Sequence, residues 1–420
     1  MPRAVYVNLD GLRRDMIAPE WTPHLSAFRA RATWFGAYRS VFPSATRVVS
    51  ATFATGTYPA RHGLQGNTMA LIEGDRLVVH DAGEAEFLQK KRALTGASLA
   101  TPTLGERLAN KGGAILFNNV SPGAAYAHDP DGFGHVYNRA GSYGPGRKRL
   151  ADAEGLQIGL DPAGDRAMTE RFCGEILTER KPALAVLWTG EPDHAQHTSP
   201  LGSPEQLAVL KHADANAGRV IAAVDRQRAK GEEILLAIGS DHGHETVTGV
   251  IDIEAELVAA GLQRDATSGD VAAVSNGTSA LVYVHPRHKG RIPDLARFLA
   301  AQSWAGQVVD GGGLAAIGQS PANGLTIAVS MRADREPNAY GIKGRSLVAK
   351  PHFGKPDRAG FGQHGGLAAH EQMPFLMIEG SGFAAGATET RAASPVDLAP
   401  TILSFLGAAH DGLDGRALQR

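Results

Sequence analysis

Short apolar runs, each followed by polar residues, recur along the chain. Five of them are predicted as strands: residues 4–9, 114–118, 183–188, 234–238 and 374–378. Continuous apolar runs of this length are typical of parallel strands that are buried on both faces of a sheet. Stretches with helical spacing of apolar residues lie between them. This alternation predicts an α/β fold, in which helices sandwich a doubly wound, mostly parallel sheet.

The predicted helices have recognisable ends. Three of them begin at a hydroxyl residue followed by proline, a pair that favours the first helical turn: Thr22, Thr101 and Ser203. The second is expected to end near Gly112 and the third at Gly231. Two further helices, at residues 48–55 and 398–406, are each followed by a glycine, which commonly ends a helix.

Residues 251–355 differ in pattern from the rest of the chain. Alternating apolar runs at residues 280–284 and 325–331 are separated by glycine-rich stretches. This arrangement is more typical of a small α+β unit than of a continued parallel sheet. We therefore expect a catalytic core formed by residues 1–250 and 356–420, with residues 251–355 inserted as a small α+β cap.

Composition narrows the classes of function. The 420 residues include 42 Lys and Arg and 43 Asp and Glu, a formal net charge of −1. Such a balance provides no general positive field, so neither a nucleic-acid polymer nor a membrane surface is expected as a partner. The apolar start of the chain is too short for a signal peptide, and the single cysteine, Cys173, cannot form an intramolecular disulfide. Both features favour the cytoplasm.

Residue types that bind metal ions lie next to the predicted strands. Asp10 follows the first strand, Asp193 and His197 the third, and Asp241 and His242 the fourth, while His364 precedes the fifth. Because ligands bind at the carboxyl ends of the strands in doubly wound sheets, these side chains are expected at one edge. Each alone fits a turn or a helix cap, but their coincidence predicts a metal site. Carboxylate and imidazole suit Zn²⁺ well, and Mn²⁺ or Fe less specifically.

The segment at residues 40–67 offers a nucleophile. Ser44 and Thr46 precede the predicted helix at residues 48–55, so either hydroxyl would lie at a helix N-terminus, where N–H groups favour an anion. An alcohol is unreactive at its ordinary pKa, and coordination to a metal ion would generate the alkoxide. On these residues alone, either hydroxyl also fits a simple N-cap.

Five segments together resemble the alkaline phosphatase superfamily, most of all its nucleotide pyrophosphatase/phosphodiesterase branch. They are VNLDGLRRDM, PSATRVVSATFATGTYPARHGLQGN, EPDHAQH, SDHGH and QHGG, in that order along the chain. The resemblance covers most of residues 1–250 and 360–420, and the inserted region matches only loosely. It implies the fold of that superfamily and a two-metal phosphohydrolase that cleaves a phosphodiester or pyrophosphate-type bond through a phosphothreonine intermediate.

The resemblance also implies roles for individual residues. Thr46 matches the metal-bound nucleophile, and Asn67 matches the asparagine whose amide holds a phosphoryl oxygen. The ligands of the metal that activates Thr46 match Asp10, Asp241 and His242, and those of the second metal match Asp193, His197 and His364.

The chain departs from the branch after the nucleophile. Arg47-Val48-Val49 stands where its phosphodiesterases often have Phe-Pro-Asn, so Arg47 either reaches a charged group of the substrate or forms a salt bridge at the surface. Other imidazole and cationic side chains near the motifs are expected to be supporting or surface groups: His62, His128, His244, His352, His370, Lys343, Arg345 and Lys350.

Other activities of the same core stay open. The alternatives are a phosphomonoesterase and a phosphonate hydrolase of the phosphonoacetate type, although residues 117–124 contain no pair of lysines to hold a second carboxylate. A sulfatase is disfavoured because Cys173 stands in Arg-Phe-Cys-Gly-Glu, and a binding protein without activity is disfavoured by the full set of expected ligands. We expect a small phosphorylated or phosphonate substrate, and the oligomeric state is not predicted.

Overall fold

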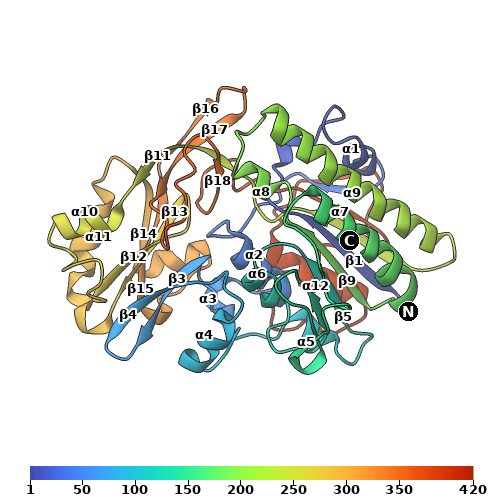
Figure 1. Cartoon of the computed structure of the whole chain (residues 1–420), viewed down its shortest axis with the longest axis horizontal. Coiled ribbons are helices and arrows are strands. Elements are labelled where there is room, and N and C mark those ends of the chain that lie inside the picture. The colour runs from blue at the N-terminus through green and yellow to red at the C-terminus, as the bar shows by residue number, and fades with distance from the viewer. Residues whose placement is uncertain (420) are drawn as a thin grey trace.

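The computed structural model describes residues 1–419 and is built around a ten-stranded sheet (Figure 1). Its strands are β1 (Arg3–Leu9), β2 (Thr33–Phe35), β5 (Ala114–Asn118), β6 (His135–Tyr137), β7 (Tyr143–Gly144), β8 (Lys148–Arg149), β9 (Leu184–Thr189), β10 (Ile234–Gly239), β19 (Leu376–Glu379) and β20 (Thr388–Glu389). Their order is β20-β2-β19-β10-β1-β9-β5-β6-β7-β8. The central strands β10, β1, β9 and β5 run parallel, which confirms the mostly parallel sheet expected from the sequence.

The strand predicted at residues 374–378 forms as β19, but it runs antiparallel to β10, contrary to the parallel direction expected for it. A continuous apolar run indicates burial on both faces and does not fix the direction of a strand. Pro374, just before β19, pairs with Arg13, which lies just beyond the carboxyl end of β1. The chain therefore enters β19 from the carboxyl edge of the sheet, without a crossover.

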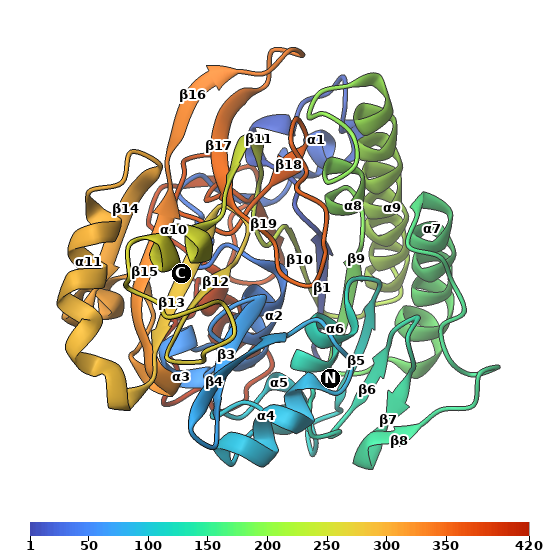
Figure 2. The same ribbon diagram turned by 60° about the vertical axis from the view of Figure 1, so that its left-hand side comes forward.

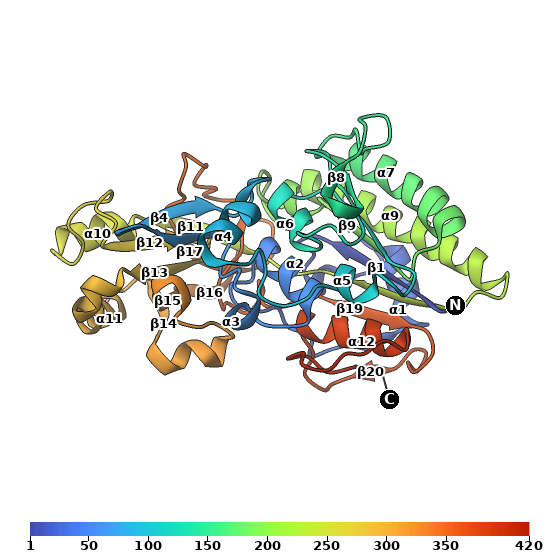
Figure 3. The same ribbon diagram turned by 90° about the horizontal axis from the view of Figure 1, so that it is seen from below.

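Helices cover both faces of this sheet (Figures 1 and 3). One face carries α1 (Pro23–Arg29), α7 (Pro162–Arg171) with its π-helical continuation Phe172–Arg180, and α9 (Pro204–Arg228). The other carries α2 (Thr46–Thr55), α5 (Leu104–Leu108), α6 (Pro122–Ala127) and α12 (Leu398–Phe405). Each layer encloses its own hydrophobic cluster, with Phe28 and Val220 in one and Phe53 and Leu403 in the other.

The helix expected from Thr101 to Gly112 is much shorter than predicted. It forms only as α5, and its N-cap is Thr103, whose hydroxyl accepts the N–H of Glu106 at 3.3 Å. Thr101 instead shares a hydrogen bond of 3.0 Å with Thr57, so its hydroxyl is not free to cap a helix. Further short helices are α3 (Pro59–His62), α4 (Phe87–Thr95) and α8 (Asp193–Gln196), with 3-10 segments at Arg14–Met16, Pro145–Arg147, Pro286–Arg291, Gly311–Ile317, Ala322–Gly324 and Pro395–Asp397.

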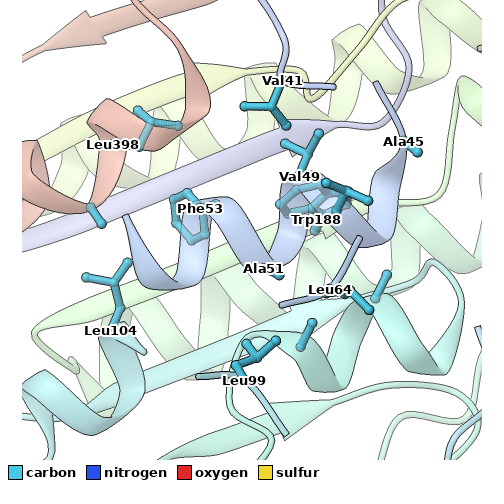
Figure 4. Packing of buried hydrophobic residues seen from close by; sticks show 14 of the residues in the cluster. Val41, Ala45, Val49, Ala51, Phe53, Leu64, Leu99, Leu104, Trp188 and Leu398 are labelled. Atoms are coloured by element: carbon cyan, nitrogen blue, oxygen red, sulfur yellow. The ribbon is translucent and has the colours of Figure 1, made fainter. Parts of the chain in front are cut away.

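Helix α2 is buried along almost its whole length, and packing fixes its position. Phe53 stacks on Tyr6 of β1 with ring centroids 4.5 Å apart, and it meets the edge of Trp188 of β9 at 6.3 Å. Val49, one turn earlier in α2, belongs to the same cluster (Figure 4). These contacts hold Thr46, the first residue of α2, at the carboxyl edge of the sheet.

A second, antiparallel sheet lies beside the first and has the strand order β12-β13-β15-β14. These strands are β12 (Val271–Ser275), β13 (Ser279–Val284), β14 (Ala305–Asp310) and β15 (Leu325–Met331), and they pack with α10 (Ile253–Ala259) and α11 (Ile292–Ala300) in a separate hydrophobic cluster. The hairpin β3 (Thr68–Glu73) and β4 (Arg76–Asp81), from the predicted core, contacts β12. The expected division into a core of residues 1–250 and 356–420 and a cap of residues 251–355 stays a prediction.

A third sheet connects the two parts (Figure 2). Its strands are β11 (Glu245–Ile251), β16 (Ala333–Pro337), β17 (Lys343–Ala349) and β18 (Gly362–Gln363), in the order β16-β17-β11-β18. β11 starts directly after His244, and β18 ends directly before His364. The third sheet thus brings the His364 loop to the end of β10. Among the described residues, no helix is both long and apolar enough to span a bilayer.

Candidate metal centre and active site

The carboxyl ends of three central strands bring most of the predicted ligands together. Asp10 follows β1, Asp193 starts α8 after β9, and Asp241 with His242 follows β10. His364 reaches the same place from the end of β18. The adjacent parallel register of these strands explains why positions far apart in the chain meet at one edge.

One group of possible ligands consists of Asp10, Asp241 and His242, whose ligand atoms lie within 4.8 Å of one another. His242 Nε2 is 3.1 Å from Asp241 Oδ2 and 3.6 Å from Asp10 Oδ1. The Thr46 hydroxyl joins this group, at 3.1 Å from His242 Nε2 and 3.5 Å from Asp10 Oδ1. The structure therefore brings the predicted nucleophile and the three ligands expected for its metal into one cluster.

A second group lies next to the first and is centred on Asp193. His364 Nε2 is 3.6 Å from Asp193 Oδ1, and His197 Nε2 is 3.4 Å from Asp193 Oδ2. The ring of His364 stacks on that of His242 with centroids 3.6 Å apart, so the two groups share a border. The three ligands expected for the second metal are therefore neighbours. The described residues whose ligand atoms all lie within 4.8 Å of one another here are, however, Asp193, His242, His244 and His364, without His197.

Backbone carbonyls orient the imidazole rings. His197 Nδ1 lies 2.8 Å from the carbonyl oxygen of Gly362, and His364 Nδ1 lies 2.8 Å from that of Ser44. A carbonyl oxygen can only accept, so Nδ1 carries the proton and donates it in each case. The Nε2 lone pairs are left directed at the carboxylates, which is the tautomer that metal-binding histidines require.

The electrostatics of the two groups fit bound cations. Burial raises the pKa of Asp241 to about 7 and the pKa of Asp10 above its usual range, and burial lowers the pKa of His242 to about 3. Asp241 Oδ2 and Asp193 Oδ1 are buried without a hydrogen-bond donor from the described residues. Neutral imidazole nitrogens and carboxylate oxygens are all acceptors, so their close approach is favourable when cations lie between them.

His244 is a possible ligand that the sequence analysis assigned to a supporting role. It is fully buried, its Nε2 lies 3.1 Å from Asp193 Oδ1, and it belongs to the same group of possible ligands as Asp193 and His364. Its Nδ1 is 3.2 Å from the carbonyl oxygen of Gly11. The signal that could have found it is the second histidine in the segment SDHGH, two residues after His242.

The two candidate nucleophiles have different surroundings. The Ser44 hydroxyl donates to the carbonyl oxygen of Gly366 at 3.0 Å and accepts the N–H of Gly365 at 3.1 Å. It therefore holds the loop that follows His364. The Thr46 hydroxyl instead faces Asp10 and His242, within the first group of possible ligands.

Arg47 lies in the first turn of α2, and Asn67 contacts it there. Asn67 Oδ1 accepts the N–H of Arg47 at 3.1 Å, which turns the amide so that Nδ2 is free to donate elsewhere. The Arg47 side chain lies 3.6 Å from Asp81 and donates to the Ser121 hydroxyl at 3.2 Å. Arg47 thus forms a salt bridge, but in the cavity wall, with its side chain only 14% exposed, and not at the surface as one of its two expected roles had it.

The remaining residues singled out in the sequence lie outside both groups. His62 and His128 are buried in the core, His370 lies 3.4 Å from Glu245, and Arg345 and Lys350 form ion pairs with Asp334 and Asp252. Lys343 is exposed, and His352 lies at the wall of the cavity described next.

A cavity of about 350 Å³ opens beside the two groups. Thr46, Asn67, Asp193 and His364 form part of its wall, together with residues of the loop that follows β17, whereas the carboxylates and the imidazole of the first group do not line it. The volume suits a small substrate, since ligand pockets range from about 300 to 1,000 Å³. A small ligand in this cavity would meet a hydroxyl, an amide and the possible metal ligands of the second group.

Comparison with known proteins agrees with this arrangement. Residues 4–308 match the type I phosphodiesterase/nucleotide pyrophosphatase family, whereas no curated protein matches the chain. Among solved structures, murine ectonucleotide pyrophosphatase/phosphodiesterase 5, an inactive threonine-to-alanine variant in complex with AMP, has a TM-score of 0.66 at 17% identity, covering 99% of this chain and 97% of that one. The human protein has a TM-score of 0.65 at 14% identity, covering 98% and 97%.

These structural likenesses, at such low identity, concern the fold alone, and they confirm the α/β architecture. The family match is broader evidence because it spans well over half of the chain and includes four of the five motif segments. This hydrolase belongs to the type I phosphodiesterase/nucleotide pyrophosphatase family of the alkaline phosphatase superfamily.

Proposed function

We propose that this chain hydrolyses a phosphodiester or pyrophosphate-type bond, with Thr46 as the nucleophile and two divalent metal ions, Zn²⁺ favoured. The observation that carries the proposal is the place of the Thr46 hydroxyl, 3.1 Å from His242 Nε2 and 3.5 Å from Asp10 Oδ1 and at the wall of the cavity. Membership of the family supports the reaction class.

The donor set fits two metal sites. Asp10, Asp241 and His242 would hold the first ion together with Thr46, and Asp193, His197 and His364 would hold the second, with His244 beside them. When bound, two such ions lower the pKa of a hydroxyl and of water and offset the charge of the phosphoryl oxygens. Carboxylate and imidazole donors without sulfur favour Zn²⁺ over softer ions, and Mn²⁺ or Fe stays an alternative.

The reaction follows from the position of Thr46. Thr46 Oγ1 attacks phosphorus in line with the leaving oxygen; the new O–P bond forms as the bond to the leaving alcohol or phosphate breaks. Thr46 then carries the phosphoryl group with its remaining ester arm, until water attacks from the vacated side and restores the hydroxyl. The Asn67 amide, oriented by the N–H of Arg47, donates to a phosphoryl oxygen through Nδ2 in both steps.

The size of the cavity and the AMP bound to the murine relative both support a small phosphorylated substrate. A phosphate monoester or a phosphonate would meet the same groups, and the experiment below separates these alternatives. We also propose the cytoplasmic location that the sequence favours.

The test is a panel of a 4-nitrophenyl phosphodiester, the matching monoester and phosphonoacetate, run alongside elemental analysis of the purified protein. We expect close to two transition-metal ions per chain and the highest kcat/KM for the diester. A monoester preference would favour the first alternative and cleavage of phosphonoacetate the second. Full activity after exhaustive chelation would exclude the two-metal mechanism.

A further inference from the structure

The wall of the cavity carries more positive than negative charge. Its charged side chains are the cations Arg47, Arg139, Lys355 and Arg358 and the carboxylates Asp193 and Asp357. Asp193 already belongs to a group of possible metal ligands. Cations that line a substrate cavity attract anionic groups, so the partners of each cation decide what the cavity can bind.

Two of the four cations have a carboxylate in common. Arg47 lies 3.6 Å from Asp81, and Lys355 donates to the same carboxylate at 2.6 Å. Burial alone would raise the pKa of Asp81, but the charge of Arg47 and the hydrogen bond from Lys355 lower it below its usual value. Asp81 is therefore an ionised partner. Asp81 offsets one of these two positive charges, so Arg47 and Lys355 already have an ionic partner within the protein.

Arg139 is held without a carboxylate partner among the described residues. Its Nη1 donates to the carbonyl oxygens of Asn119 and Val120, at 2.7 Å and 2.9 Å. These neutral acceptors fix the direction of the guanidinium and leave its charge in place. In the described structure, Nε and Nη2 of Arg139 make no hydrogen bond with the protein, so they can donate to a ligand in the cavity.

Arg358 is anchored in the same manner. Its Nη1 donates to the carbonyl oxygen of His197 at 2.7 Å, and within the part of the chain that the structure describes it has no ion pair. This bond places the guanidinium beside the second group of possible metal ligands. The backbone of Arg358 has a φ of 59°, a left-handed conformation that costs about 1 kcal/mol or more in a non-glycine residue.

The anchors of the two guanidiniums flank helix α8. The Asn119 carbonyl that accepts Arg139 lies against Gly190, three residues before α8. The residue whose carbonyl accepts Arg358 is His197, the C-cap of the same helix. Both arginines therefore line the cavity at its α8 end. Arginine pairs of this kind bind carboxylate and phosphate groups through several parallel N–H donors.

The cavity also lacks the larger aromatic side chains. Among the described residues that line it, none is Phe, Tyr or Trp, and its flat groups are imidazoles and guanidiniums. Imidazoles and guanidiniums can stack on a base, but guanidiniums also bind anions. The excess of positive charge in the lining therefore favours a substrate with a further anionic group.

We propose that Arg139 and Arg358 form a second anion-binding subsite, so that the substrate carries a carboxylate or phosphoryl group in addition to the phosphorus that Thr46 attacks. The inference rests on the proposed function and names the substrate class of that same site. The second anion would receive N–H donors from both arginines, while the scissile phosphoryl group lies over the two metal groups.

The test uses three diesters that share a 4-nitrophenyl leaving group and a three-carbon second arm. The arm ends in a methyl ester, a carboxylate or a phosphonate, and the last two distinguish the two kinds of anion. The variants are Arg139→Gln and Arg358→Gln, with Arg297→Gln as the control, because Arg297 is an exposed arginine of α11 with one ion pair to Asp294.

We expect the unmodified chain to favour an anionic arm at least tenfold in kcat/KM. Each cavity variant should lower kcat/KM for the anionic arms about tenfold, mainly through KM, because a charged hydrogen bond is lost. In these variants kcat/KM for the methyl ester should change less than twofold. Arg297→Gln should leave kcat/KM for all three diesters unchanged. Equal losses on all three diesters would mean that the arginines only support His197, and this result or the absence of any preference would overturn the subsite.

A binding measurement separates this inference from the proposed function. By calorimetry, 3-phosphonopropanoate, with two anionic ends, should bind at least ten times more tightly than propylphosphonate, with one, and both cavity variants should remove the difference. If no diester is cleaved but this difference is seen, the subsite stands and the proposed reaction falls. If the diesters are cleaved and the two phosphonates bind alike, the subsite is wrong.

Discussion

At the scale of single residues, the structure separates side chains that look equivalent in the sequence. Ser44 and Thr46 are two residues apart at the start of one helix, yet the Ser44 hydroxyl bonds to the backbone of Gly365 and Gly366, and the Thr46 hydroxyl faces His242. The residue pattern alone could not choose between them, because the choice depends on where the His364 loop returns. The family resemblance implies Thr46, whose hydroxyl lies beside His242, and its role as the nucleophile stays a prediction.

Thr46→Ala should lower kcat for a phosphodiester by at least a thousandfold, because the covalent route is lost while the metal groups stay in place. Ser44→Ala should cost much less, since that hydroxyl only supports a loop. Steady-state kinetics on both variants, with circular dichroism to check folding, decide the point. The opposite ranking would show that the nucleophile has been assigned two residues too late.

The ligand set shows how far residue patterns reach. Asp10, Asp193, Asp241 and His242 were predictable because an Asp or His directly after a strand must lie at the carboxyl edge of a parallel sheet. His244 was not, because the direction of its ring depends on the turn that leads into β11 and on its contact with Gly11. The second histidine of SDHGH was a local signal, but it does not distinguish a ligand from a supporting residue.

His244→Ala should weaken metal binding at the second group by about ten- to a hundredfold, as expected when a group that binds or orients a metal ligand is removed. Competition with a chromophoric chelator would measure the affinity directly, without reference to activity. His212→Ala is the matched control, because His212 is exposed on α9. Equal affinities in the two variants would exclude a role for His244 in metal binding.

At the scale of elements, helix α2 links the hydrophobic core to the candidate active site. Its buried face packs on Tyr6 and Trp188, and Trp188 Nε1 also donates to Asp10 Oδ2 at 2.8 Å. The same aromatic cluster therefore positions both the nucleophile helix and a metal ligand. The extent of α2 was predicted well because small and apolar residues end at Gly56, whereas α5 was overestimated because its cap is Thr103.

Phe53→Ala should destabilise the fold by about 3–5 kcal/mol, the usual cost of removing a buried aromatic side chain. The substitution leaves a cavity between α2 and the sheet. The lost packing lowers the urea concentration at which half of the protein is unfolded. Phe133→Ala is the control, because Phe133 is 41% exposed and its loss leaves no comparable cavity. Similar midpoints for the two variants would contradict the assigned packing.

At the scale of the whole molecule, three sheets surround one cavity. The mostly parallel sheet could be predicted from continuous apolar runs, but the reversed direction of β19 and the docking of the β3–β4 hairpin on β12 could not. Both features depend on which surfaces meet in the folded chain, and a local pattern of apolar residues does not encode this. The cavity at the junction could therefore not be predicted from the sequence, although Thr46, Asn67 and other residues singled out in the sequence line it.

Acid should unfold the molecule in part through two buried histidines. Burial lowers the pKa of both His62 and His128 to about 3 in the folded chain, against about 6.5 when unfolded. The unfolded state then binds protons more readily, so stability is complete above pH 6.5 and is lost as the pH falls toward 3. The loss is about 1.4 kcal/mol per pH unit for each histidine.

His128→Leu should make the unfolding midpoint less dependent on pH between 6.5 and 4. Both ring nitrogens of His128 are buried without a hydrogen-bond partner among the described residues, so the apolar replacement sacrifices no bond. The measurement is made on chelator-treated protein, so that metal release does not contribute. His212→Leu on the surface should keep the original slope, and a slope that is also unchanged in His128→Leu would refute the explanation.

The central claim is that Thr46 attacks phosphorus and that water then displaces Thr46 from the phosphoryl group. The stereochemistry at phosphorus tests this claim most directly. A chiral phosphorothioate diester, hydrolysed in ¹⁸O-labelled water and analysed by ³¹P NMR, reports the number of in-line displacements. Two successive displacements, the first by Thr46 and the second by water, predict net retention of configuration. Net inversion would mean that water attacks the substrate directly, and it would contradict the covalent role of Thr46.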